Sequence, residues 1–77
     1  MKMLVTGGLG FIGSNFILRA LENPQFQITN VDACLHGSNL LNLKTIRNNP
    51  RYKYVKGNIT DRRLINKTVS NSDVVVN

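Results

Sequence analysis

The sequence predicts an α/β fold built around a parallel sheet, and two observations support this prediction. Short strand-like runs alternate with helix-like segments along the chain, a pattern that is typical of βαβ units. The first strand-like run leads directly into a glycine-rich turn at residues 7–13, and a helix-like segment follows that turn. Together these features predict half of a Rossmann fold, with about four parallel strands in the order 3-2-1-4 and helices on both faces.

The first half of the expected fold is a strand, a helix and a second strand. We expect strands over residues 2–6 and 27–31, and a helix over residues 11–22. Asn23-Pro24 ends this helix, since the residue before a proline is biased away from the helical conformation. Helical spacing gives the helix one wide apolar face that packs on the sheet. This face consists of Ile12, Gly13, Phe16, Ile17, Ala20 and Leu21.

The second half begins after Asp32, which ends the second strand. We expect a loop and a short helix over residues 33–47, a strand over 52–56, a helix over 61–69 and a last strand over 73–76. Thr60 is the expected N-cap of the later helix, and Asp61 suits the positive end of its dipole. The run Val74-Val75-Val76 is typical of a parallel strand that is buried on both faces, although here it would lie at an edge of the sheet.

The composition is that of a small globular protein. The chain has 77 residues, of which 42% are apolar, so we expect a single domain over residues 1–77, smaller than a typical domain. The single cysteine, Cys34, excludes an internal disulfide and fits a reducing, cytoplasmic setting. No apolar run approaches the roughly 20 residues that span a bilayer, and residues 1–8 fit a first strand better than a signal peptide. We therefore expect no membrane partner.

The charge of the chain is unevenly distributed. The formal net charge is +6, and eight of the ten basic residues lie at or beyond Lys44. This imbalance indicates either an anionic partner, such as a nucleotide or a nucleic acid, or the solvated surface of one part of a larger protein. The basic residues are spread over several expected elements and few aromatic residues accompany them. We therefore favour the solvated surface, and a nucleic acid is the weaker candidate.

The glycine turn matches two forms of the dinucleotide fingerprint, Gly8-x-Gly10-x-x-Gly13 and Gly7-x-x-Gly10-x-x-Gly13. The early glycines permit a tight turn, Gly10 leaves no side chain between the backbone and a pyrophosphate, and Gly13 lets the helix pack closely on the strand. The pyrophosphate would meet free N–H groups at the start of the helix. Asp32 follows 19 residues after Gly13, where its carboxylate can accept hydrogen bonds from ribose hydroxyls and favours NAD over NADP.

Residues 3–16 resemble the opening of the extended short-chain dehydrogenases/reductases, the nucleotide-sugar epimerase and dehydratase group. Within this group the chain is most similar to the dTDP-glucose 4,6-dehydratases. The similarity continues through Asp32 and through residues 37–40, 49–52 and 55–61. It covers essentially all of this chain, but only the opening part of a family member.

The resemblance implies an NAD site at the matching positions. The glycine turn would line the pyrophosphate, the acid after the second strand would hold the ribose, the loop at residues 33–39 would close over the adenosine, and the residues after the third strand would face the adenine edge. In chain order these residues are Gly7, Gly10, Phe11, Ile12, Gly13, Asp32, Ala33, Gly37, Ser38, Asn39, Asn58 and Ile59.

Two parts of the implied site depart from the family pattern. The family usually has an aspartate where this chain has Asn58. An amide can still offer an oxygen to the adenine amino group, but a charge-assisted hydrogen bond is lost. The loop Ala33-Cys34-Leu35-His36 also differs from the usual version, which carries lysine, threonine and tyrosine. Both departures bear on the strength of binding.

The resemblance also implies a catalytic Tyr-x-x-x-Lys on a later helix, which is not found in residues 1–77. Tyr52-x-x-x-Lys56 matches by letters, but it lies on an expected strand, where Tyr52, Tyr54 and Lys56 share one face and serve packing and solvent exposure. Cys34 and His36 cannot supply the four ligands of a structural zinc site. We therefore predict neither a catalytic residue nor a metal ligand in this chain.

Two functions remain open at this point. The first is the NAD-binding N-terminal part of a nucleotide-sugar enzyme, a lyase similar to the dTDP-glucose 4,6-dehydratases, that is inactive without the rest of the enzyme. The second is a stand-alone module that binds a nucleotide or associates with itself. A homodimer formed through the Val74–Val76 edge would continue the sheet and cover an apolar strand.

Overall fold

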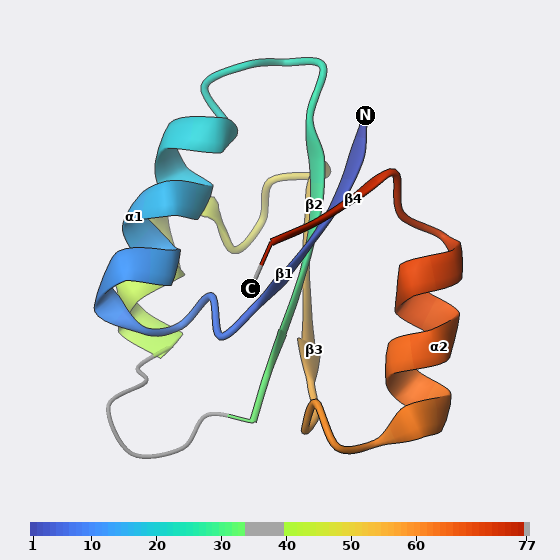
Figure 1. Cartoon of the computed structure of the whole chain (residues 1–77). Coiled ribbons are helices and arrows are strands. Elements are labelled where there is room, and N and C mark those ends of the chain that lie inside the picture. Colours follow the sequence, from blue (N-terminus) through green and yellow to red (C-terminus); the bar gives the residue numbers. More distant parts are fainter. Residues whose placement is uncertain (34–39, 77) are drawn as a thin grey trace.

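The computed structural model describes residues 1–33 and 40–76, which form a four-stranded sheet between helices (Figure 1). The strands pair in parallel in the order β3-β2-β1-β4, which confirms the predicted fold class and strand order. In chain order the elements are β1 (Lys2–Thr6), α1 (Phe11–Ala20), β2 (Gln27–Asp32), the 3₁₀ helix η1 (Leu40–Ile46), β3 (Tyr52–Lys56), α2 (Arg62–Ser70) and β4 (Val74–Val76).

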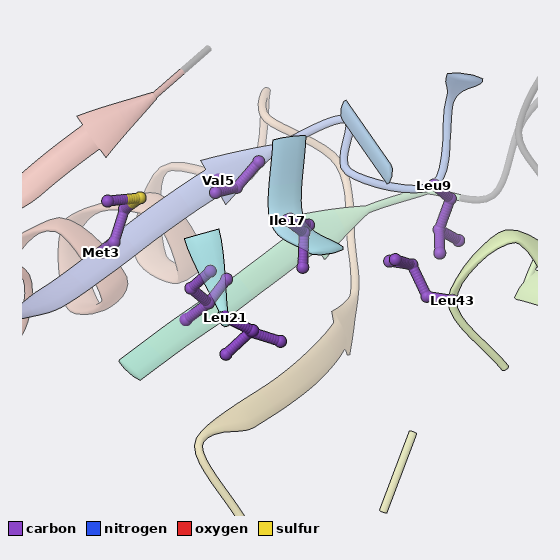
Figure 2. Packing of buried hydrophobic residues seen from close by; sticks show 7 residues of the cluster. Met3, Val5, Leu9, Ile17, Leu21 and Leu43 are labelled. Carbon is purple, nitrogen blue, oxygen red and sulfur yellow. The ribbon is translucent and has the colours of Figure 1, made fainter. Parts of the chain in front are cut away.

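The main hydrophobic core lies between the sheet and α1. Side chains alternate between the two faces of a strand, so one set of apolar residues from β1 and β2 points toward α1. Leu9 of the glycine turn and Leu43 of η1 lie together at one end of this core (Figure 2). Every residue of the cluster is at most 7% exposed: Met3, Val5, Leu9, Ile17, Leu21, Ile28 and Leu43.

The buried face of α1 is narrower than the sequence predicts. Ile17 is buried as expected, but Ile12 is 83% exposed and Phe16 is 37% exposed, while Ser14 is buried instead. The reason is that Gly13 lies directly against the backbone of the glycine turn, which fixes the rotation of the helix about its axis. Periodicity alone admitted a wider stripe, because it carries no information about this contact.

The opposite face of the sheet is covered by α2 (Figure 1). The packing there is looser than on the α1 face. Leu4 is fully buried on this side, but no residue of α2 is buried. The expectation that β4 is buried on both faces is wrong. Val74 and Val76 pack against the core on the α1 side, whereas Val75 is 49% exposed on the other side.

Because the strands are parallel, their carboxyl ends lie at one edge of the sheet, and β2 and β3 reach that edge at the bottom of Figure 1. The chain leaves β1 toward α1 on one face and reaches β4 from α2 on the other face. In open α/β sheets such a reversal creates a crevice at the carboxyl edge where ligands bind. Among the described residues, no helix is long and apolar enough to cross a bilayer.

Candidate functional site

The glycine turn follows β1 at the carboxyl edge of the sheet and is held in a tight conformation. Gly7 has φ of +71°, in the left-handed region that glycine occupies without the steric cost of a Cβ. Its N–H donates to the carbonyl oxygen of Val31 at 3.0 Å, and its own carbonyl accepts from the N–H of Gly10 at 3.2 Å. The turn is therefore bonded both to itself and to the end of β2.

The start of α1 packs against this turn with no room for a side chain. A Cβ on Gly13 would lie 2.5 Å from the carbonyl oxygen of Gly7 and 2.9 Å from the Cα of Gly8. Both are backbone atoms that cannot move aside. Gly13 is thus required by the fold itself, as the predicted close packing of helix on strand demands.

Gly10 differs from its neighbours, because the fold does not require a glycine there. Its φ of −71° and ψ of 170° are open to any residue, and an added Cβ would meet only the carbonyl oxygen of Gly7 at 3.5 Å, an ordinary contact. Open space therefore lies beside the backbone of Gly10, at the N-terminus of α1. This is the place where the fingerprint predicts a pyrophosphate.

The first turn of α1 offers backbone donors to that space. Gly10 is the N-cap, and the intrahelical bonds begin with the N–H of Ser14, which donates to the carbonyl oxygen of Gly10 at 2.9 Å. The N–H groups of Phe11, Ile12 and Gly13 precede this bond and have no acceptor within the helix. The first turn has no acidic residue, and a helix N-terminus favours an anion.

Asp32 lies at the end of β2, beside the glycine turn. It is only 6% exposed, and its Oδ2 accepts a hydrogen bond from the N–H of Leu9 at 2.9 Å. The predicted ribose-binding carboxylate is therefore fixed in position by the same turn that is predicted to hold the pyrophosphate. Sequence spacing predicted this proximity, but not the bond to Leu9.

The region after β3 lies at the same edge. The N–H of Gly57 donates to the carbonyl oxygen of Asp32 at 3.2 Å, which places the exposed Asn58 and Ile59 beyond the ends of β2 and β3. The Oδ1 of Asn58 accepts from both the N–H and the hydroxyl of Thr60, each at 3.0 Å. The oxygen that we expected to face adenine is therefore already used within the turn.

The structure describes only part of the predicted adenosine loop. Ala33 is half-buried directly after Asp32. The predicted residues Gly37, Ser38 and Asn39, together with Cys34 and His36, lie outside the described residues. Over residues 1–33 and 40–76, no group of acidic, histidine or cysteine side chains could hold a metal ion.

Asn30 is a site residue that sequence reasoning missed. It is fully buried in β2, its Oδ1 accepts from the N–H of Gly8 at 2.9 Å, and its Nδ2 donates to the hydroxyl of Tyr52 at 3.2 Å. The sequence gives one indication of this role: Asn30 is an amide residue two positions after Ile28, on the strand face that forms the core.

Tyr52 and Lys56 lie on β3 and do not form a catalytic pair on a helix. The hydroxyl of Tyr52 accepts from Asn30, and the neighbouring Tyr54 hydroxyl donates to the carbonyl oxygen of Asp32 at 3.1 Å, whereas Lys56 is exposed. Burial raises the pKa of Tyr52 above its ordinary 10.0; the hydrogen bond from Asn30 opposes this rise, and the charge of Asp32 adds to it. The predicted packing role of this strand face is consistent with these contacts.

Comparison with known proteins identifies the family. The family model described as GDP-mannose 4,6 dehydratase matches residues 4–77. A low-salt glycan biosynthesis protein of Haloferax volcanii is 40% identical over 77 residues, which cover 100% of this chain and 25% of that protein. A dTDP-glucose 4,6-dehydratase of an Actinoplanes species is 42% identical over 81 residues, which cover 97% of this chain and 25% of that protein.

Solved structures show the same fold. The dTDP-glucose 4,6-dehydratase of Bacillus anthracis, crystallised in complex with NAD, superposes with a TM-score of 0.90 at 41% identity, over 97% of this chain and 25% of that chain. The UDP-glucuronic acid 4-epimerase of Bacillus cereus in complex with NAD gives 0.84 at 29% identity, over the same shares. This chain thus spans about a quarter of the length of these relatives. It belongs to the GDP-mannose 4,6 dehydratase family, within the extended short-chain dehydrogenases/reductases.

Proposed function

We propose that this chain is the NAD-binding N-terminal part of a nucleotide-sugar 4,6-dehydratase of the dTDP-glucose type. The observation that carries the proposal is the open space at Gly10, in a turn where Gly13 leaves no such space. Solved relatives with the same fold bind NAD, and when bound NAD supplies a hydride acceptor for oxidation of a substrate.

The residues present fit such a cofactor. The pyrophosphate would lie against Gly10 and accept hydrogen bonds from the first N–H groups of α1. Asp32 would accept from the ribose hydroxyls, and its charge would repel the 2′-phosphate of NADP. Because the N–H of Leu9 fixes the carboxylate of Asp32, both recognition elements are positioned before the cofactor arrives.

We further propose that residues 1–77 bind the cofactor without turning over a sugar. The Tyr52 hydroxyl accepts a hydrogen bond from Asn30. Tyr52 and Lys56 both lie on the strand β3, where the Tyr-x-x-x-Lys spacing does not bring the two side chains together as it does on a helix. The helical Tyr-x-x-x-Lys of the family would have to come from another part of the protein. Conversion of dTDP-glucose by residues 1–77 in the presence of NAD would contradict this part of the proposal.

Calorimetric titration with NAD, run in parallel on Gly10→Ala, tests the cofactor site. We expect the wild-type chain to release heat on binding NAD, and Gly10→Ala to bind at least about tenfold more weakly, a loss of about 1.4 kcal/mol. The thermal unfolding midpoint of Gly10→Ala should stay close to that of the wild type, since the added Cβ makes an ordinary contact.

Gly13→Ala provides the contrast for this titration. Its Cβ would overlap the backbone of Gly7, so we expect it to lose stability as well as affinity. NAD binding of equal strength in the wild type and Gly10→Ala, or no heat with the wild type, would count against the cofactor site.

We also propose, as a second candidate function, self-association through β4. The support is the half-exposed Val75 on a strand that, among residues 1–33 and 40–76, pairs with β1 on one side only. The open side of β4 can accept either a strand from a longer chain or the β4 of a second copy. Light scattering at high micromolar concentration separates the two cases, because a dimeric mass that Val75→Lys reduces to a monomeric one supports self-association. A monomeric mass for the wild type rejects it.

A further inference from the structure

The buried carboxamide of Asn30 joins the glycine turn to the sheet through two hydrogen bonds. Its oxygen accepts from the N–H of Gly8 at 2.9 Å, and its nitrogen donates to the hydroxyl of Tyr52 at 3.2 Å. Asn30 is 0% exposed. An amide buried without partners costs several kcal/mol on an apolar transfer scale, so both bonds are needed to keep it there.

The carboxamide lies directly against the backbone of Gly8. A Cβ added to Gly8 would overlap Oδ1 of Asn30 and would come within 2.5 Å of Cδ1 of Ile17. The glycine at this position thus makes room for Asn30 and α1 rather than for a cofactor. This explains why the chain carries a glycine at residue 8 as well as at residue 7, which begins the other form of the fingerprint.

Two consecutive N–H groups of the turn are bound by side chains of one strand. The N–H of Gly8 donates to Asn30, and the N–H of Leu9 donates to Asp32. Residues two apart on a strand point to the same face. The acceptor side chains of Asn30 and Asp32 on β2 therefore face the two consecutive N–H groups of the turn. The path of the backbone between β1 and Gly10 is set by these two side chains as well as by the glycines.

We propose that Asn30, held by Tyr52, is a positioning residue that fixes the glycine turn for the dinucleotide. This inference rests on the proposed NAD site and assigns it a residue that does not touch the cofactor. A carboxamide suits this role because it accepts from Gly8 and donates to Tyr52 while remaining neutral. A carboxylate would place a second buried negative charge beside the pyrophosphate and would be repelled by it.

The chain offers a matched pair of variants for the test. Tyr52→Phe removes the hydroxyl that binds Asn30, and Tyr54→Phe removes a hydroxyl from the same face of β3 that binds the carbonyl oxygen of Asp32 instead. Each variant loses its hydroxyl group and keeps its ring. The readout is the hydrogen-exchange rate of the Gly8 amide, measured by NMR without NAD and compared with the amide of Val5 in the core.

We expect Tyr52→Phe to speed hydrogen exchange at the Gly8 amide by roughly three- to tenfold relative to the Val5 amide. This factor corresponds to the net free energy of about one hydrogen bond. Tyr54→Phe should leave the Gly8-to-Val5 ratio unchanged. A ratio that changes equally in both variants, or in neither, overturns the positioning role. Because this readout needs no cofactor, it remains decisive even if NAD does not bind and the proposed function fails.

Asn30→Asp supplies the second arm, with NAD affinity measured from about pH 5 to 8. At about pH 8 we expect Asn30→Asp to bind NAD about tenfold more weakly than the wild type. At about pH 5 its affinity should recover toward that of the wild type, because the carboxyl group becomes protonated. Wild-type affinity at every pH would overturn the argument for a neutral side chain. If Asn30→Asp does not fold, the exchange ratio in Tyr52→Phe still decides the proposal.

Discussion

At the scale of single residues, Tyr52 shows how burial changes the acidity of a hydroxyl group in this fold. Its ring packs against the core cluster, and its hydroxyl accepts a hydrogen bond from Asn30. Burial raises the pKa of Tyr52 above 10.0, and the nearby charge of Asp32 acts in the same direction, while the hydrogen bond from Asn30 acts against both. The folded state therefore favours the neutral hydroxyl.

This preference predicts a loss of stability in alkali. A group whose pKa is raised on folding contributes its full share to the free energy of unfolding below its unfolded pKa, and loses it as the pH rises through the folded pKa. For Tyr52 the loss begins near the ordinary 10.0. We expect urea denaturation at about pH 8 and about pH 11 to show a larger drop for the wild type than for Tyr52→Phe. Equal drops would show that Tyr52 plays no part.

The residues of the site were predictable to the extent that their roles are local. The spacing of the glycines and of Asp32 predicted where a pyrophosphate and a ribose would lie, and the structure brings these residues to one edge of the sheet. Asn30 was not predicted, because its partners Gly8 and Tyr52 lie 22 residues away on either side. Only the parallel pairing of the strands brings them together.

At the scale of elements, the start of α2 shows how one turn residue displaces another as a cap. The sequence predicts Thr60 as the N-cap, and this prediction is wrong. Asp61 is the N-cap, and its Oδ1 accepts from the N–H of Leu64 at 3.2 Å. The hydroxyl of Thr60 donates to Asn58 instead, because the Asn58 side chain forms a turn of its own.

This exchange of caps gives a direct prediction for stability. Asp61→Ala should lower the free energy of unfolding by about 1 kcal/mol, as expected for loss of an N-cap. Thr60→Ala should cost less, since it removes a hydroxyl on an exposed turn. Chemical denaturation of the two variants measures both values, and a larger loss for Thr60→Ala would contradict the assignment of the cap.

The bounds of the elements were more predictable than their faces. β1 and β3 begin and end at the expected residues, and α1 begins at Phe11 as expected, although it ends at Ala20. The direction in which α1 presents its side chains was not predictable from periodicity, because the contact of Gly13 with Gly7 sets it. Gly7 and Gly13 lie at the two ends of the glycine turn, and the spacing of apolar residues does not predict the conformation of that turn.

At the scale of the whole molecule, the two faces of the sheet are unequal. The α1 face holds the core cluster and the site, whereas the helix on the α2 face has no buried residue. The strand order 3-2-1-4 was predictable, because parallel βαβ units with right-handed crossovers leave few topologies. The unequal packing of the two faces was not predictable from the sequence, since it depends on how closely α2 approaches the sheet.

The assignment to the NAD-binding part of a nucleotide-sugar dehydratase is tested most directly by calorimetric titration of residues 1–77 with NAD and with NADP. We expect NAD to bind at least about tenfold more tightly than NADP, because the charge of Asp32 repels a 2′-phosphate. Asp32→Asn, which can still accept from the N–H of Leu9, should narrow that difference. Absence of NAD binding, or equal affinity of the wild type for the two cofactors, would contradict the assignment.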